Sequence, residues 1–240
     1  MANAGVLISL DGRKILIDAP IRDGIPPYPT SSPQERALLE QARSPYDRIS
    51  AILTTHWHED HFDAKAVGAH LTRSSGTRLI SSAEIIERVR STLPSVPAAR
   101  VVAVTPAAGA SVAVPIDGGI RVHVLRIRHN DARRMPEQHV GFLIQGTRTV
   151  LHVGDADPTP ANFALLKKLP KVDLALLPYW FVLNAKNREF VAASIAPERI
   201  VGMHLPVEEA AKVERGLRAA GANVILLTRP GTLVANAGVD

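Results

Sequence analysis

Residues 54–61 read TTHWHEDH and hold three histidines and two carboxylates within six positions. Imidazole nitrogens and carboxylate oxygens are ligands that suit zinc, manganese and iron alike. His56 and His58 lie two residues apart, so in extended backbone both side chains point the same way and can bind one ion. Asp60 and His61 follow directly and can serve a second ion. The segment therefore predicts a metal centre rather than an accidental cluster.

The remaining ligands should come from the ends of other strands, where α/β folds build their sites. Two cations about 3.5–4 Å apart can share a bridging hydroxide if a carboxylate holds the pair together. Asp155 ends the apolar run RTVLHVGD, with Gly154 giving room to turn, and we assign it as this bridge. His129 ends IRVHVLRIRH, and His204 ends RIVGMH. Five histidines and two aspartates would suit two ions.

Four other histidines fall outside this set. His123 lies six residues before His129, roughly 20 Å away along one strand, so the two cannot share a site. We expect His70 at the surface of a helix and His152 in the packed interior of a strand. His139 precedes a strand beside the site, where it could contact substrate, orient a ligand or serve as an ordinary loop residue.

Local patterns predict the elements that carry these residues. Asp11-Gly12 joins two apolar runs, a strong hairpin signal. Ser32, Pro33 and Glu35 supply an N-cap, a first-turn proline and a capping-box partner for a helix over 33–43. Other helices are expected at about 63–72, 82–92, 160–168 and 207–220. Strands are expected at 50–54, 78–81, 101–104, 120–127, 173–177, 199–203 and 223–227.

Two hairpin patterns resemble each other. GVLISLDGRKILIDAP ends just past Asp18, and the stretch over 136–156, which includes GFLIQGTRTVLHVGDA, ends just past Asp155. The similarity predicts a duplicated half-domain, with two chance hairpins as the alternative. Strands interleaved with helices favour one α/β domain over 1–240 with two sheets between helices. The Pro-rich loop PIRDGIPPYPTSS and the segment YWFVLNAKN are candidates to lie over the site.

Composition narrows the class of protein. The chain has 240 residues, of which 46% are hydrophobic and 21% charged, a typical globular balance. It has no cysteine, which excludes disulfides and thiolate zinc sites. No apolar run is long enough to span a membrane. We expect a cytoplasmic protein by default, although the abrupt start in a strand also fits an exported chain trimmed of its leader.

The net charge of +5 includes a group of arginines that could attract an anionic small molecule or nucleic acid: Arg121, Arg126, Arg128, Arg133 and Arg134. A solvated basic surface is the plainer interpretation. The G-x-S-x-G motif of serine hydrolases is absent, and so are the usual nucleotide-binding motifs.

The pattern His56-Trp-His58-Glu-Asp60-His61 resembles the H-x-H-x-D-H motif of the metallo-β-lactamase superfamily. The later His129, Asp155 and His204 fall in the order that this superfamily shows. The resemblance covers nearly the whole chain and is strongest to the branch of ascorbate-6-phosphate lactonase-like proteins. It implies a four-layer αββα sandwich made of two similar halves.

The resemblance also implies how the ligands are shared. His56, His58 and His129 would hold one ion, and Asp60, His61 and His204 the other, with Asp155 between them. Asp18 matches an aspartate that supports the ligand loop from behind.

These ligands predict a dinuclear hydrolase of a small ester, lactone or phosphoester. A divalent ion lowers the pKa of bound water from 15.7 to about 7, so a bridging hydroxide can attack at neutral pH. Asp60 would hold the hydroxide and carry a proton. Tyr179 could donate a hydrogen bond to the developing oxyanion or pack as part of a lid, and Trp57 is expected to pack. Zinc is the default metal, followed by manganese, with iron also open.

Four alternatives stay open. A nuclease or other phosphodiesterase is suggested by the arginines, although aromatic residues make up only 4% of the chain. A mono-iron dioxygenase would bind iron and consume oxygen. A β-lactamase is less favoured because Asp155 as a bridge resembles the wider hydrolases. A binding protein with an unused metal site is the least favoured. The sequence predicts no oligomeric state.

Overall fold

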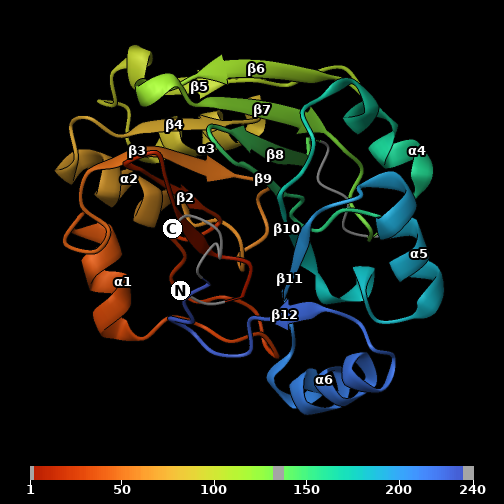
Figure 1. The fold of residues 1–240 in the computed structure, drawn as a ribbon. Helices are drawn as coiled ribbons and strands as arrows, with labels where there is room; N and C mark the ends of the chain where they lie inside the picture. The colour runs from red at the N-terminus through yellow and green to blue at the C-terminus, as the bar shows by residue number, and fades with distance from the viewer. Residues whose placement is uncertain (1–2, 132–137, 235–240) are drawn as a thin grey trace.

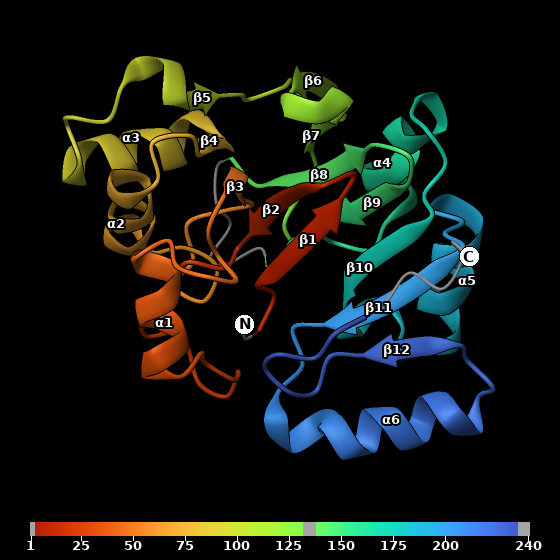
Figure 2. The same ribbon diagram turned by 60° about the vertical axis from the view of Figure 1, so that its left-hand side comes forward.

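Two sheets pack face to face in the computed structural model, which describes residues 3–131 and 138–234 (Figure 1). Three helices cover the outer face of the first sheet: α1 (Pro33–Glu40), α2 (Ala64–Arg73) and α3 (Ala83–Thr92). The second sheet is covered by α4 (Pro160–Phe163), α5 (Ala185–Ser194) and α6 (Ala210–Ala219), as Figure 2 shows from another side. The predicted four-layer αββα architecture is therefore confirmed.

The first sheet has the order β1-β2-β3-β4-β5. Its strands are β1 (Val6–Leu10), β2 (Arg13–Ile17), β3 (Ile49–Thr54), β4 (Arg78–Ser81) and β5 (Val101–Ala103). The second sheet has the order β12-β11-β10-β9-β8-β7-β6. Its strands are β6 (Ser111–Pro115), β7 (Arg121–Arg126), β8 (Val140–Gln145), β9 (Thr149–His152), β10 (Leu174–Pro178), β11 (Arg199–Met203) and β12 (Val224–Leu226).

The two halves repeat one topology. In the first half, the antiparallel hairpin β1–β2 is followed by β3, β4 and β5, each parallel to the strand before it. In the second half, the antiparallel hairpin β8–β9 is followed by parallel β10, β11 and β12. The hairpin loops also meet, because Thr147 donates to the Asp11 carboxylate from its backbone N at 2.8 Å. The predicted internal repeat is therefore confirmed, except at 136–137, which lie outside the described residues.

Alternating side chains of the strands fill three hydrophobic layers. On β2, Ile15 and Ile17 pack between the sheets, whereas Leu16 packs against the helices of the first half. In the second half, Phe163 and Phe181 fill the layer between the sheet and its helices. Both faces of each sheet are thus covered, which explains the nearly continuous apolar runs of the strands.

The predicted helix starts are mostly correct. Ser32 accepts from the backbone N of Glu35, as the capping pattern requires. The helix expected at 160–168 is α4 followed by a 3₁₀ turn, η3 (Ala164–Lys168), and that expected at 207–220 is η5 (Val207–Glu209) followed by α6. Other 3₁₀ turns are η1 (Ala98–Arg100), η2 (Asp117–Gly119) and η4 (Tyr179–Phe181).

Some expectations about the elements were incomplete. Strand β6 was not predicted, and neither was α5, whose N-cap Asn184 accepts from the backbone N of Asn187. The segment YWFVLNAKN is therefore not all loop. No helix in the described part of the chain is long and apolar enough to cross a membrane.

His70 is buried, contrary to the prediction that it lies at a helix surface. It faces α1, where its Nδ1 donates to the carbonyl of Leu39 at 2.6 Å. The apolar face of α2 includes this position because His70 lies three and four residues after Val67 and Ala66, which are also buried.

Candidate metal centre

The turn between β3 and α2 carries the first of the predicted ligands. It is closed by the carbonyl of His58, which accepts from the backbone N of His61 and of Phe62 at 2.9 Å each. Asp63 then caps α2 by accepting from the backbone N of Ala66 at 2.8 Å. The chain reverses at this turn, and His56 and His58 lie side by side, as predicted, with Nε2 and Nδ1 2.9 Å apart.

The remaining predicted ligands follow strands of the second sheet. Asp155 lies just past β9, after Gly154 with φ +55°. His129 lies just past β7 and forms an isolated bridge with Ala156. His204 directly follows β11 and has φ +54°, a backbone conformation that costs free energy in a residue other than glycine. All seven predicted ligands are buried, and none is more than 8% exposed.

The seven side chains form two groups in which potential ligand atoms lie within 4.8 Å of one another. The first group is His56, His58, His129 and Asp155, and the second is Asp60, His61 and His204. Asp155 also approaches the second group: its Oδ1 lies 3.3 Å from Nε2 of His61, and its Oδ2 lies 3.3 Å from Nε2 of His204. The carboxylate therefore lies between the groups.

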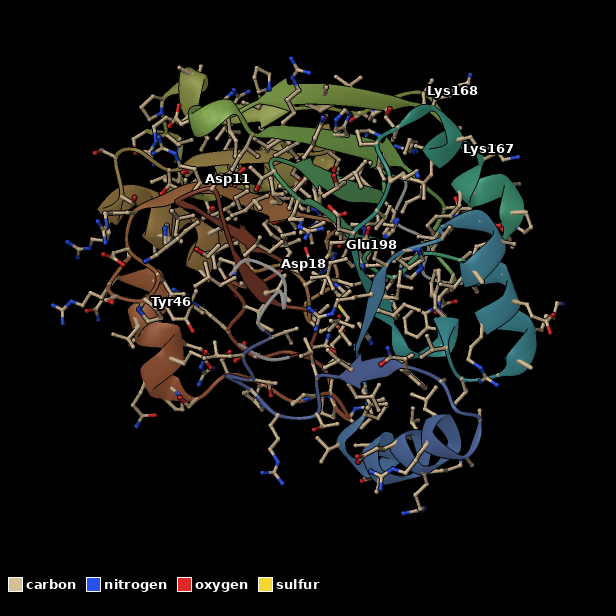
Figure 3. All side chains as sticks on the ribbon, in the orientation of Figure 1. Asp11, Asp18, Tyr46, Lys167, Lys168 and Glu198 are labelled. Carbon is tan, nitrogen blue, oxygen red and sulfur yellow. The ribbon has the colours of Figure 1, made fainter. Side chains whose placement is uncertain are left out.

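Asp18 orients the rings of His56 and His61 from the side that faces away from the site. Its Oδ2 accepts from Nδ1 of His61 at 2.8 Å and from the hydroxyl of Thr55 at 2.7 Å. Because the Thr55 hydroxyl donates its proton to Asp18, it accepts from Nδ1 of His56 at 2.9 Å. In the neutral form of each ring the proton is then on Nδ1, which leaves the Nε2 lone pair to face the site. Asp18, near the middle of the molecule in Figure 3, thus contacts the turn that the sequence expected it to support.

His139 contacts the backbone of Asp155, one of the predicted ligands. Its Nδ1 donates to the carbonyl of Ile127 at 3.1 Å, and its Nε2 accepts from the backbone N of Asp155 at 3.2 Å. Burial, together with the neighbouring His129, lowers the pKa of His139 to about 3, so the ring is neutral. The sequence left three roles open for His139. This geometry favours the role of orienting Asp155 over contact with substrate.

The unpaired atoms of the cluster fit a bound cation. Nε2 of His129 and Oδ1 of Asp155 are buried and make no hydrogen bond among the described residues. Burial works to raise the pKa of Asp155, but His204 and His61 hold it well below its usual range. Asp155 and Asp60 raise the pKa of His61 well above its usual range against the effect of burial. The carboxylates thus attract positive charge, which a divalent ion can supply.

One ring requires a rearrangement before it fits. Nδ1 of His129 accepts from the backbone N of Asp131 at 3.0 Å. The proton of the neutral ring is then on Nε2, the atom that faces Asp155 at 3.8 Å. Nδ1 must give up its hydrogen bond with Asp131 and take the ring proton before Nε2 of His129 can bind a cation.

The structure adds aromatic residues to one side of the site. The Tyr28 ring lies edge-on to His204 with centroids 4.1 Å apart, and the Trp180 ring lies 5.3 Å from the same histidine. Tyr28 comes from the Pro-rich loop that the sequence placed over the site, although the residue itself was not singled out. Tyr179 is half-buried and packs on Trp180, whereas Trp57 packs beside His58 under the Arg88 guanidinium.

Asn3 is a second residue that sequence reasoning missed. Its side-chain amide donates to Oδ2 of Asp60 at 2.9 Å. No sequence signal pointed to it, because 57 residues separate the two partners.

Comparison with known proteins agrees with this geometry. Residues 13–227 match the family described as the beta-lactamase superfamily domain, so the chain belongs to that family. A curated protein of Caldivirga maquilingensis named "UPF0173 metal-dependent hydrolase" is 25% identical over 212 residues, which cover 85% of this chain and 79% of that protein.

Two solved structures share the fold. A possible metal-dependent hydrolase from Veillonella parvula superposes with a TM-score of 0.65 and 14% identity, covering 93% of each chain. CmlA, a diiron β-hydroxylase from Streptomyces venezuelae, gives a TM-score of 0.60 and 16% identity, covering 94% of this chain and 51% of CmlA. Together, the family, the curated relative and the buried donor set place the chain among the metal-dependent hydrolases of the superfamily.

Proposed function

We propose that the protein is a dinuclear metal-dependent hydrolase of a small ester, lactone or phosphoester. In this proposal His56, His58 and His129 hold one divalent ion, Asp60, His61 and His204 hold the other, and Asp155 binds both. The observation that carries it is the position of Asp155, whose oxygens lie 3.3 Å from His61 and His204 and 3.8 Å from His129.

The metal ions, when bound, would supply Lewis acidity and a nucleophilic hydroxide at neutral pH. The residues of the chain supply orientation and exclude water. Asp18 and Thr55 direct the Nε2 lone pairs of two histidines into the site. Asp60 can accept a proton at Oδ2, which lies 3.1 Å from Nε2 of His204. We also propose that the Tyr179 hydroxyl donates a hydrogen bond to the developing oxyanion.

The burial of the donor groups favours a small substrate. The aromatic side of the site offers the rings of Tyr28 and Trp180 beside His204. Burial raises the pKa of the Tyr28 hydroxyl, and the nearby Asp155 raises it further, so this group stays a hydrogen-bond donor. A small molecule with a polar reacting centre and an apolar or planar neighbour would fit these groups better than a duplex nucleic acid.

The arginine group supports an anionic substrate only in part. Arg121 and Arg128 are exposed and Arg126 is half-buried, whereas Arg133 and Arg134 lie outside the described residues. Zinc is the proposed metal, with manganese next, because five imidazoles and two carboxylates suit both.

The variant Asp155→Ala tests the proposal. We expect hydrolysis to fall by at least about 100-fold, because even the outer partners of metal ligands typically cost 10–100-fold when removed. The measurement is the rate on nitrophenyl esters, lactones and bis-nitrophenyl phosphate, with zinc or manganese added.

Asp157→Ala is the matched control, because Asp157 lies two residues after Asp155 in the chain and belongs to neither group of predicted ligands. Wild-type rates in Asp155→Ala, with its circular dichroism spectrum unchanged, would refute the bridging role.

A further inference from the structure

Two residues just before β1 contact the β3–α2 turn of the first half and strand β9 of the second half. Asn3 is 7% exposed, and its Nδ2 donates to Oδ2 of Asp60 at 2.9 Å and to the Asp60 carbonyl at 3.3 Å. The single side chain therefore holds both the carboxylate and the backbone of one predicted ligand. The same Oδ2 is the oxygen that faces Nε2 of His204 at 3.1 Å.

The next residue makes a contact in the second half. The carbonyl of Ala4 accepts from Nε2 of His152 at 3.0 Å. Nδ1 of that ring accepts from the backbone N of Gly154 at 3.2 Å, one residue before Asp155. His152 is thus the packed, hydrogen-bonded residue that the sequence predicted, and it connects the segment before β1 to the turn that carries Asp155.

The orientation of the Asn3 amide follows from its surroundings. Rotating the amide by half a turn would place Oδ1 against the two oxygens of Asp60, so Nδ2 must face Asp60. Oδ1 is then buried without a hydrogen bond among the described residues. Leaving a polar atom buried and unpaired is costly, typically by about 1–3 kcal/mol, and such atoms call for a reason beyond folding.

We propose that Asn3 is a positioning residue for the second metal group. It directs Oδ2 of Asp60 toward His204 and His61, so that the three donors converge before an ion binds. This inference rests on the proposed dinuclear function. In this proposal Asn3 acts through Asp60, with which its side-chain amide makes both of its hydrogen bonds.

The variants Asn3→Asp and Asn3→Gly separate this role from a general effect on the fold. Asn3 has φ +53°, and both replacements tolerate this left-handed conformation. Asn3→Asp keeps the shape but removes the donor and adds a charge facing Asp60. Asn3→Gly removes the donor without adding a charge.

The experiment titrates cobalt or zinc into metal-free protein and follows binding by calorimetry and by cobalt absorption. We expect wild type to bind two ions. Asn3→Gly should bind one ion normally and the other 10–100-fold more weakly, as is typical when a residue that hydrogen-bonds a metal ligand is removed. Asn3→Asp should change the affinity of that same ion alone, because its added carboxylate both repels Asp60 and attracts the cation. Asn187→Asp is the control, because it makes the same change in an amide that donates to the carbonyl of Trp180.

The outcomes separate the two proposals. Failure of wild type to bind two ions would contradict the dinuclear function itself. Two ions bound with wild-type affinity in both variants would overturn the role of Asn3. An equal weakening of both ions, with a lower unfolding temperature of the metal-free variants, would show a structural role and overturn it as well.

Discussion

At the scale of single residues, the site depends on which ring nitrogen carries a proton. Asp18 accepts from His61 directly and from Thr55, which in turn accepts from His56. One buried carboxylate thereby sets the tautomers of two predicted ligands on the same turn. Such outer contacts orient ligands and raise their basicity.

Gly154 gives a prediction at this scale. Its φ is +55°, and an added Cβ would lie 2.8 Å from Nε2 of His139 and from Cβ of Thr55. Gly154→Ala should destabilise the protein by about 2–5 kcal/mol, because a left-handed conformation costs about 1–2 kcal/mol and overpacking about 1–3 more. It should also lower metal content, because Asp155 follows directly. Denaturant unfolding and metal analysis measure both effects.

Gly216→Ala is the control for this variant. This glycine lies inside α6, and an added Cβ would meet no atom within 4 Å. The change should be neutral or stabilise the protein by about 0.5–1 kcal/mol. Equal stability of both variants would show that the turn at Gly154 tolerates a side chain.

Sequence reasoning found residues whose spacing carries a signal. The seven predicted ligands were recognisable because histidines and aspartates rarely occur together in such numbers, and because each of them follows an apolar strand. Asn3 and Tyr28 carry no such signal, because an asparagine before a strand and a tyrosine in a Pro-rich loop have many ordinary roles. Their contacts with Asp60 and His204 arise only when distant segments meet.

At the scale of elements, capping patterns explain which helices were predictable. The side chains of Ser32 and Asp63 each accept from the backbone N of the residue three positions later in the chain, as expected for residues that precede a helix. Helix α5 was missed although Asn184 caps it in the same way. Its segment has only one fully buried residue, Val191, so the apolar periodicity that reveals α2 is weak there.

His70 on α2 gives a prediction about pH. Burial lowers the pKa of this ring in the folded protein, and Arg100 lowers it further, against the hydrogen bond to Leu39. An unfolded ring with a pKa of about 6.5 therefore takes up a proton first as the pH falls. The stability that His70 contributes is present above about pH 6.5 and is lost below it, by up to about 1.4 kcal/mol per pH unit until the folded ring also titrates.

The test is His70→Asn, in which the amide can still donate to the Leu39 carbonyl but does not titrate. We expect metal-free His70→Asn to lose less stability than metal-free wild type between pH 7 and pH 5, measured by urea unfolding. The other histidines contribute equally to both proteins and cancel. Parallel losses in the two proteins would contradict the prediction.

At the scale of the whole molecule, the site joins the two halves of the fold. Each donor group combines residues of the β3–α2 turn with residues that follow strands of the second sheet. The backbone N of Val140 also donates to the carbonyl of Thr55, which connects the sheets beside the site. Ions bound here would therefore stabilise the packing of the halves as well as supply chemistry.

The most direct test of the dinuclear account is the metal content of freshly purified protein by plasma mass spectrometry. We expect close to two divalent ions per chain, zinc or manganese, and clearly fewer in Asp155→Ala. A single iron per chain would contradict it and favour the dioxygenase alternative. No bound metal, even after reconstitution, would contradict the interpretation of TTHWHEDH as a metal centre.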